Sequence, residues 1–181
     1  MSPRQYVVAA VQLCAGSDKI ANLDKAEAFA AEAVRYAARL LVLPEVFLWR
    51  GPRAEEHAAA EPIPGPSSNR LGELARRLKL HLLAGSILEQ SGQRRVFNTS
   101  ILFDSHGQIV ARYRKIHLFD VDIPERVTIR ESDTRMNGDT VVTAPTELGV
   151  IGMSVCYDLR FPELYRQLTL GGAEIIAVPS A

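Results

Sequence analysis

Three ionisable side chains share one local context in this sequence, because each directly follows an apolar segment with the length of a buried strand. Glu45 follows LLVLP, Lys115 follows IVARYR and Cys156 follows GVIGMSV. Open α/β sheets place their ligands at the ends of such strands. A thiol needs a base to become a thiolate, and acyl transfer needs a cation or N–H donors where the oxyanion forms. Glutamate, lysine and cysteine can supply those three roles.

Each of these residues also has an ordinary structural interpretation. A buried cysteine is more often a small core hydrophobe, a glutamate after a strand is more often a helix cap or a surface group, and a lysine beside Arg112 and Arg114 is usually solvated. The combination favours nucleophilic catalysis, with Cys156 on a strand-to-helix turn. A helix predicted to start at residues 161–162 would bring backbone N–H groups behind the thiol and lower its pKa.

The elements that must position these side chains are predicted as β-α-β-α-β, followed by a hairpin and a final strand-helix-strand unit. Hydrophobic patterning predicts strands over residues 6–13, 40–43 and 81–88, and helices over residues 22–38, with Asn22 as N-cap, and 69–80. The first strand is expected to be buried on both faces. A hairpin is predicted from segments 96–103 and 109–113, and the last unit from segments 149–156, 161–170 and 174–180. Residues 115–139 lack periodicity, which is typical of a functional loop or of disorder.

Composition narrows the class of protein. A chain of 181 residues with 47% hydrophobic and 23% charged residues predicts one globular domain over residues 1–181. Lysine plus arginine equal aspartate plus glutamate at 21 each, so no net field favours nucleic acid or an anionic membrane. No apolar stretch reaches the length of a membrane span, and the start suits a strand better than a secretory signal. With two cysteines, no disulfide framework is suggested, and we expect a cytoplasmic location.

Other reactive side chains point less clearly to chemistry. The four histidines have no close ligand spacing and Cys14 is expected in the core, so we expect neither a metal site nor a cofactor. His117 leaves open a cysteine-histidine peptidase. Asp158, Arg160 and Glu163 are expected to form a charge network around the cysteine turn, with Arg160 as a candidate for binding a substrate carboxylate.

Three motifs, LPEVF, YRKIHLFDVDIP and SVCYDLRFPEL, make the chain resemble the nitrilase (carbon-nitrogen hydrolase) superfamily. They occur in the family's order and spacing, and family-like sequence runs from Tyr6 to Ala181. The resemblance implies an α/β (α+β layered) fold, the αββα sandwich of the nitrilase type. The motif KIHLFDVDIP with a following glutamate-serine is most similar to the branch of omega-amidases and deaminated glutathione amidases.

Residue roles follow from the resemblance by matching its motifs. They make Glu45 the general base and acid, Lys115 the oxyanion-stabilising cation and Cys156 the nucleophile. A second family glutamate matches Glu131, and the backbone N–H of Tyr157 matches the family's oxyanion donor. Two carboxylates around one lysine are expected to raise each other's proton affinity while keeping the lysine charged.

The function that the resemblance implies is hydrolysis of a non-peptide C–N bond. The expected substrate is a small aliphatic amide, the omega-amide of a keto or dicarboxylic acid, cleaved through a cysteine acyl-enzyme with release of ammonia; a nitrilase or an N-carbamoyl amine hydrolase is the alternative enzyme. His117 would then support the lysine loop. Expected partners are the amide, water and further copies of the chain in a dimer or larger homo-oligomer, without nucleic acid or membrane.

The resemblance also raises a question about completeness. The family continues beyond the strand EIIAVPSA with a further helix and strands, so we expect a C-terminally truncated sandwich, with sheet edges and apolar faces uncovered. A second hypothesis is therefore a catalytically impaired form that acts as a binding or assembly protein.

Overall fold

The first sheet carries the predicted β-α-β-α-β order. A computed structural model describes residues 5–181, so the first four residues of the predicted domain lie outside the described part. The order is β1 (Val7–Ala10), α1 (Lys19–Arg35), β2 (Ala38–Val42), the 3-10 turn Arg53–Glu55, α2 (Glu56–Ala59), α3 (Pro66–Leu78) and β3 (His81–Gln90). β1, β2 and β3 pair in parallel. The predicted hairpin, β4 (Val96–Phe103) and β5 (Ile109–Arg114), extends this sheet in the antiparallel sense.

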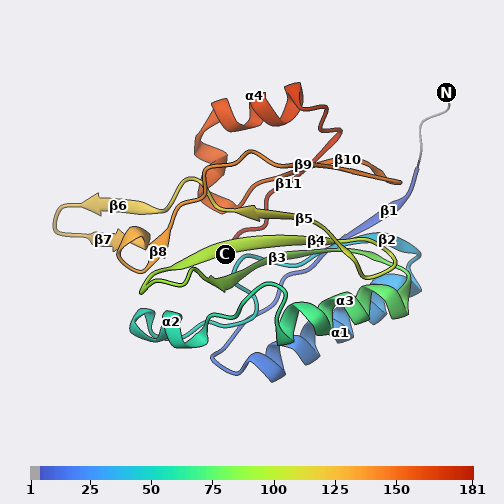
Figure 1. The fold of residues 1–181 in the computed structure, drawn as a ribbon, viewed down its shortest axis with the longest axis horizontal. Helices are drawn as coiled ribbons and strands as arrows, with labels where there is room; N and C mark the ends of the chain where they lie inside the picture. The colour runs from blue at the N-terminus through green and yellow to red at the C-terminus, as the bar shows by residue number, and fades with distance from the viewer. Residues whose placement is uncertain (1–4) are drawn as a thin grey trace.

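A second, smaller sheet lies against the first. It consists of β9 (Thr143–Thr146), β10 (Gly149–Met153) and β11 (Ile175–Ala177) in the order β11-β10-β9. Helices α1 and α3 cover the outer face of the first sheet, and α4 (Pro162–Leu170) lies on the outer side of the second (Figure 1). The layers are helix, sheet, sheet and helix, so the predicted αββα class is confirmed.

Two separate apolar layers explain why the central strands have nearly continuous apolar sequences. Successive side chains of a strand point to opposite faces, so a strand covered on both faces needs apolar residues at every position. Leu41, Leu82 and Phe103 pack in the layer against α1 and α3. Their neighbours Leu40, Leu83 and Leu102 pack in the layer between the sheets, against Ile151 and Met153.

The first strand differs from its prediction. β1 forms one edge of its sheet, and Val7 and Val8 are each 46% exposed, so the expectation of burial on both faces is wrong. The strand also ends at Ala10, which leaves Cys14 in the following loop, where it is exposed rather than in the core. An edge strand has a neighbouring strand on one side only. A short apolar run in the sequence does not distinguish an edge strand from a central one.

The start of α1 also differs from its prediction. Asp18, not Asn22, is the N-cap, and its side chain accepts hydrogen bonds from two backbone N–H groups of the first turn at 2.9 and 3.0 Å. The Asn22 amide is buried and donates instead to the carbonyls of Gly16, at 2.7 Å, and Leu48, at 2.9 Å. Asn22 therefore fastens the helix to the segment that follows β2.

The segment without sequence periodicity, residues 115–139, is not a structureless loop. It contains the hairpin β6 (Asp120–Ile123) and β7 (Val127–Arg130), the 3-10 turn Glu131–Asp133 and the short strand β8 (Arg135–Met136), which pairs with β4. The hairpin projects from the body of the molecule at the left of Figure 1. Within residues 5–181 its two strands pair only with each other, which explains why they lack an apolar face.

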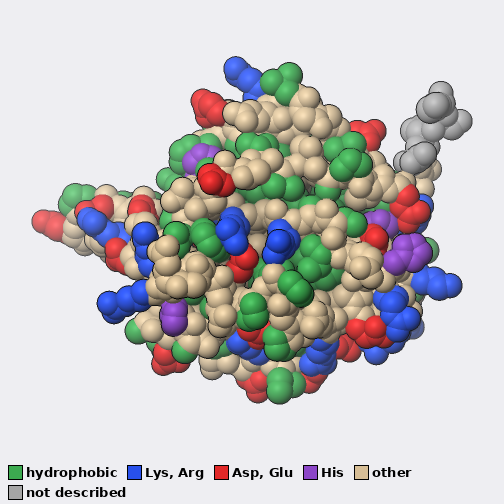
Figure 2. All heavy atoms as spheres, viewed as in Figure 1, with side chains coloured by type: hydrophobic (Ala, Val, Ile, Leu, Met, Phe, Trp, Pro, Cys, Tyr) green, Lys and Arg blue, Asp and Glu red, His purple; other side chains and the backbone are tan. Residues whose placement is uncertain are grey.

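Charged side chains of both signs are dispersed over the face drawn in Figure 2, and they extend onto the projecting hairpin. This distribution agrees with the equal numbers of acidic and basic residues. None of the helices within residues 5–181 combines the length and apolar character needed to cross a membrane.

Candidate active site

The segment after β2 turns sharply and directs the Glu45 side chain inward. Val46 adopts a left-handed backbone conformation, with φ of 47°, and its N–H donates to Ser86 Oγ at 2.9 Å. The facing residue on β3 is Gly85, where a Cβ atom would lie only 2.0 Å from the Pro44 carbonyl oxygen. The close approach of the two backbones therefore requires glycine. Glu45 is left 6% exposed.

Lys115 extends from the end of β5 into the protein and is 2% exposed, so the interpretation as a solvated lysine is wrong. Its backbone N–H donates to the Asn98 carbonyl at 2.9 Å. Its Nζ atom lies 2.9 Å from both Glu45 Oε1 and Glu131 Oε2. Burial alone would lower the pKa of Lys115, but the two carboxylate charges outweigh it and hold the pKa above its ordinary value. The ammonium therefore stays charged.

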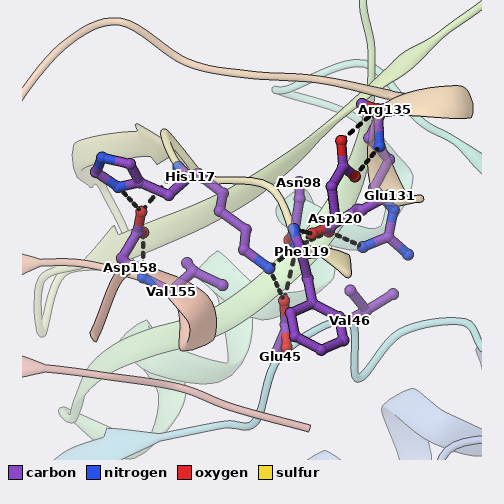
Figure 3. A network of polar contacts seen from close by, with 12 residues as sticks. Glu45, Val46, Asn98, His117, Phe119, Asp120, Glu131, Arg135, Val155 and Asp158 are labelled. Carbon is purple, nitrogen blue, oxygen red and sulfur yellow. Dashed lines mark hydrogen bonds and ion pairs between the residues drawn. The ribbon is translucent and has the colours of Figure 1, made fainter. Parts of the chain in front are cut away.

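Glu131 is buried and takes hydrogen bonds from several donors (Figure 3). Besides Lys115, these are the Phe119 N–H at 2.7 Å, Arg135 Nη1 at 2.6 Å and, more distantly, Asn98 Nδ2 at 3.4 Å. Burial would raise the pKa of Glu131, but Lys115 and Arg135 together hold it below its ordinary value. The expected rise in proton affinity is therefore wrong for this carboxylate. Sequence reasoning missed Arg135, because the segment that carries it has no periodic pattern and its other carboxylate partner, Glu56, lies on a distant element.

Cys156 follows β10 and is the first residue of the 3-10 helix Cys156–Arg160. Its φ of 48° is left-handed, a conformation that is costly for a residue with a Cβ atom and that occurs often at functional sites. The pKa of the thiol is raised, first by burial and then by the charge of Glu45, against smaller lowering effects of the Ala181 N–H and Lys115. The expected lowering of the thiol pKa is therefore wrong. The thiol needs a base, and Glu45 is the neighbouring carboxylate.

Asp158 fastens the cysteine turn to the segment that carries the lysine. It is completely buried, and its Oδ2 atom accepts from the Val155 N–H at 2.8 Å and from the Tyr113 hydroxyl at 2.7 Å. Its Oδ1 atom accepts from the His117 N–H at 2.9 Å and contacts His117 Nδ1 at 2.8 Å. One side chain thus joins β5, the lysine loop and the cysteine turn.

The expected charge network of Asp158 with Arg160 and Glu163 does not form, since both of these residues are exposed and Asp158 has the other partners. The His117 ring stacks on Phe161 with the centroids 3.7 Å apart and bonds Asp158. It is not among the side chains that line the cavity at Cys156. This position agrees with a supporting role for His117 and gives no support to a cysteine-histidine peptidase.

All five residues predicted for the site line one cavity of about 510 Å³: Glu45, Lys115, Glu131, Cys156 and Tyr157. The Tyr157 N–H takes no part in the hydrogen bonds that hold the cysteine turn within the described chain. Its ring packs edge-on against Phe119 with centroids 4.9 Å apart. The side chain therefore packs, while the backbone N–H is left available to a ligand.

Three exposed arginines, Arg50, Arg53 and Arg160, also line the cavity. None of them forms an ion pair with a carboxylate inside the described range 5–181. Arg50 and Arg53 were not anticipated, because the path of the loop after β2 has no periodic signal. Together they give the cavity a surplus of positive charge that suits an anionic ligand.

Comparisons with known proteins agree with this geometry. A family model described as carbon-nitrogen hydrolase matches residues 7–181. The chloroplastic omega-amidase of Arabidopsis thaliana is 38% identical over 184 residues, which cover 98% of this chain and 49% of the plant protein. The deaminated glutathione amidase of Synechocystis is also 38% identical over 184 residues, which cover 98% of this chain and 67% of that protein.

A solved structure supports the fold independently. The crystal structure of Saccharomyces cerevisiae Nit3, described as a member of branch 10 of the nitrilase superfamily, superimposes with a TM-score of 0.83 at 34% identity. The superposition covers 96% of this chain and 64% of the yeast chain. This chain thus spans about half to two thirds of the length of the curated relatives that it matches.

Proposed function

The chain belongs to the carbon-nitrogen hydrolase family of the nitrilase superfamily, and from this premise we propose that it hydrolyses a small amide through a thioester on Cys156. One observation carries the proposal. The Lys115 ammonium is 2% exposed and lies 2.9 Å from Glu45, and both side chains line the cavity that contains Cys156. A buried cation beside a carboxylate and a thiol supplies the charge, the base and the nucleophile that acyl transfer needs.

In the proposed cycle, Glu45 takes the thiol proton while the Cys156 sulfur attacks the amide carbonyl carbon. The carbonyl electrons move to oxygen, and the oxyanion is stabilised by Lys115 and by the Tyr157 N–H. Two of the three ammonium protons point to carboxylates, which leaves one for the oxyanion. Collapse breaks the C–N bond, and Glu45 donates its proton to the leaving ammonia.

The second half of the proposed cycle uses the same carboxylate in reverse. Glu45 removes a proton from water, whose oxygen attacks the thioester carbonyl, and returns the proton to the departing Cys156 sulfur. Glu131 touches neither reacting atom in this scheme. It holds the other side of Lys115 and so orients the ammonium.

We further propose that the substrate is the omega-amide of a keto or dicarboxylic acid. Its amide would lie at Cys156 and its carboxylate at the arginines, of which Arg160 is four residues beyond the nucleophile and unpaired within residues 5–181. The omega-amidase and deaminated glutathione amidase relatives support this substrate class by their names. A nitrile or an N-carbamoyl amine is the alternative substrate. Release of carbon dioxide identifies the carbamoyl compound, and a comparison of turnover between a nitrile and its matching amide tests the nitrile.

The cellular setting and assembly are proposals of the same kind. Both cysteines are free, which supports a cytoplasmic location. A homo-oligomer of two or more copies is supported by exposed apolar side chains such as Leu170, at 82%, and Leu159, at 60%. We take residues 1–181 as a single carbon-nitrogen hydrolase domain, with the silent assembly protein as the competing hypothesis.

The test is ammonia release from dicarboxylic acid monoamides, with trapping of the acyl-enzyme by intact mass. Cys156→Ala is expected to lower turnover by more than about a thousandfold and to abolish the adduct. Cys14→Ala, which changes the exposed thiol, is expected to match the wild type. Turnover that survives in Cys156→Ala would disprove the nucleophile assignment, and a folded wild type that forms no adduct would favour the silent assembly protein.

A matched pair of substrates tests the carboxylate proposal. A monoamide acid and an amide of the same length with a methyl group in place of the carboxylate are compared by kcat/KM. The acid is expected to be favoured by at least about tenfold, the worth of one charge-assisted contact. Equal values would contradict the role given to the arginines.

A further inference from the structure

The Arg135 side chain, at the start of β8, is clamped between two buried carboxylates. Its Nη1 atom lies 2.6 Å from Glu131 Oε1. The guanidinium also forms a bidentate contact with Glu56 of α2. Its Nη2 atom donates to Glu56 Oε1 at 2.6 Å, and its Nε atom donates to Glu56 Oε2 at 3.1 Å. Glu56 is 4% exposed and is also held by the Thr134 hydroxyl at 2.7 Å.

This clamp extends the charges of the site into a line of alternating sign. The order along the cavity wall is Glu56, Arg135, Glu131, Lys115 and Glu45, each in contact with the next. Figure 3 labels Arg135, Glu131 and Glu45 within this network of polar contacts. A buried line of this kind is stable only if the charges are paired throughout.

We propose that Arg135, held in place by Glu56, is a positioning residue that keeps Glu131 ionised and thereby leaves Glu45 as the carboxylate that exchanges protons. The inference rests on the proposed function, because it explains why one of two similar carboxylates does the acid-base work.

The hydrogen bonds of Glu131 carry the first step of the argument. Its Oε2 atom accepts from Lys115 and from the Phe119 N–H, and its Oε1 atom accepts from Arg135. All three partners are donors without acceptor capacity at those nitrogens. A proton on either oxygen would face an N–H group, so protonating Glu131 requires a bond to break.

Glu45 has the opposite arrangement. Both hydrogen bonds that its carboxylate receives from nitrogen donors, from Lys115 and from Asn98, fall on Oε1 at 2.9 Å each. A proton can therefore join Oε2 without breaking either bond. Arg135 and the Phe119 N–H thus distinguish the two carboxylates, because Lys115 and Asn98 contact both, and of these two distinguishing donors only Arg135 carries a charge.

Glu56 fixes the orientation of the Arg135 guanidinium. The two-pronged contact fixes the plane of the guanidinium, which an isolated arginine at the cavity wall would lack. It also balances the second positive charge, since Arg135 contacts one carboxylate on each side. Without this anchor the guanidinium would be free to turn into the cavity and to compete for an anionic ligand.

The competing explanation is that the ion pairs of Arg135 with Glu56 and Glu131 only stabilise the packing of α2 and β8 against the rest of the protein. A structural fastening and a positioning role differ in one observable. Loss of a fastening lowers stability without moving the titration of the site, whereas loss of Arg135 moves the pH dependence.

The experiment measures two pH profiles in a Cys14→Ala background. One is the rate at which iodoacetamide alkylates Cys156, read by intact mass, and the other is kcat/KM for the amide. The variants are Arg135→Met, Arg135→Lys and Glu56→Gln. The matched control is Arg76→Met, which removes an exposed two-pronged arginine-glutamate contact on α3, far from the cavity.

Arg135→Met is expected to move the acid limb of kcat/KM and the alkylation midpoint to higher pH by about one unit, because the cavity wall loses one positive charge and the charge that keeps Glu131 ionised. Arg135→Lys is expected to recover most of the shift, because the charge is kept. Glu56→Gln is expected to move both midpoints in the same direction as Arg135→Met but by less, since the amide keeps one acceptor oxygen while its NH2 group breaks the bidentate contact that holds the guanidinium. Arg76→Met is expected to overlay the wild type.

Variants that melt at lower temperature but keep both wild-type pH profiles would overturn the proposal in favour of a fastening. If Arg135→Met does not fold, Glu56→Gln decides, since an unchanged profile or a shift to lower pH contradicts the inference. A wild type without amide turnover would refute the proposed function alone, because the alkylation profile still tests the role of Arg135.

Discussion

At the scale of single residues, the site contains two glutamates that contact the same lysine and nevertheless differ. Glu131 is saturated with donors and its pKa lies below its ordinary value, so it holds Lys115 without taking a proton. Glu45 lies beside Cys156 and raises the pKa of that thiol. Environment, not side-chain type, therefore distinguishes Glu131, the proposed anchor, from Glu45, the proposed base.

A glutamine at position 45 should separate thiol reactivity from hydrolysis. The charge of Glu45 raises the pKa of Cys156, so Glu45→Gln should lower that pKa and speed alkylation at neutral pH by up to about tenfold per unit. Hydrolysis should fall by about 10² to 10⁴, because the base and acid are lost. Alkylation and ammonia release on the same preparation are the measurements. Glu163→Gln, an exposed change on α4, is the control, and slower alkylation of Glu45→Gln would be the contrary result.

At the scale of elements, the place where β2 and β3 meet decides where the glutamate points. The left-handed turn at Val46 is held by Ser86, and Gly85 allows the two backbones to touch. The pairing of β3 with β4 shifts register between Ala84 and Ile87, at the same place. The irregularity in the strand therefore coincides with the turn that carries Glu45, the proposed base.

Gly85→Ala tests this junction. Its Cβ atom would lie 2.0 Å from the Pro44 carbonyl oxygen and 2.1 Å from that of Leu43, so the backbones must separate. We expect a loss of about 1–3 kcal/mol in the free energy of unfolding, measured with urea, and a larger loss in turnover. Gly16→Ala is the matched control, because no atom lies within 4 Å of its added Cβ, and it should change stability by less than about 0.5 kcal/mol. Full activity in Gly85→Ala would contradict the role given to the junction.

The elements that could be predicted from sequence are those with a periodic apolar face. The central strands are covered on both faces and therefore read as continuous apolar runs. Helix α3 is covered on one face and therefore has one apolar stripe. β6, β7 and β8 are two to four residues long and contain charged residues, so neither length nor period reveals them. Asp18 and Asn22 are equally good caps by type, and only the path of the chain distinguishes them.

At the scale of the whole molecule, the candidate site depends on contacts between distant parts of the chain. Glu45 and Lys115 are 70 positions apart, and Tyr113 and Asp158 are 45 apart. The motifs predicted which residues would meet, because their identity and order resemble a family. They could not predict Arg135, whose partner on α2 is 79 positions away. Such pairings depend on how the layers stack, which local pattern does not encode.

Stability should fall as the pH falls, because several buried or partly buried groups bind protons less readily in the folded chain. Hydrogen bonds and charges outweigh burial and lower the pKa values of Glu61, Glu89 and Glu131, so their stabilisation is present above about pH 4.5 and is lost as the pH falls through the lowered values. Burial lowers the pKa of His81, so its neutral form contributes above about pH 6.5 and loses this contribution on acidification. The midpoint of urea-induced unfolding should therefore decline gently from pH 7 to pH 5, where of these four groups only His81 gains a proton, and steeply below pH 5, where the three glutamates do. His81→Gln should flatten the first part and Glu89→Gln the second, and midpoints that rise towards acid would contradict the assignment.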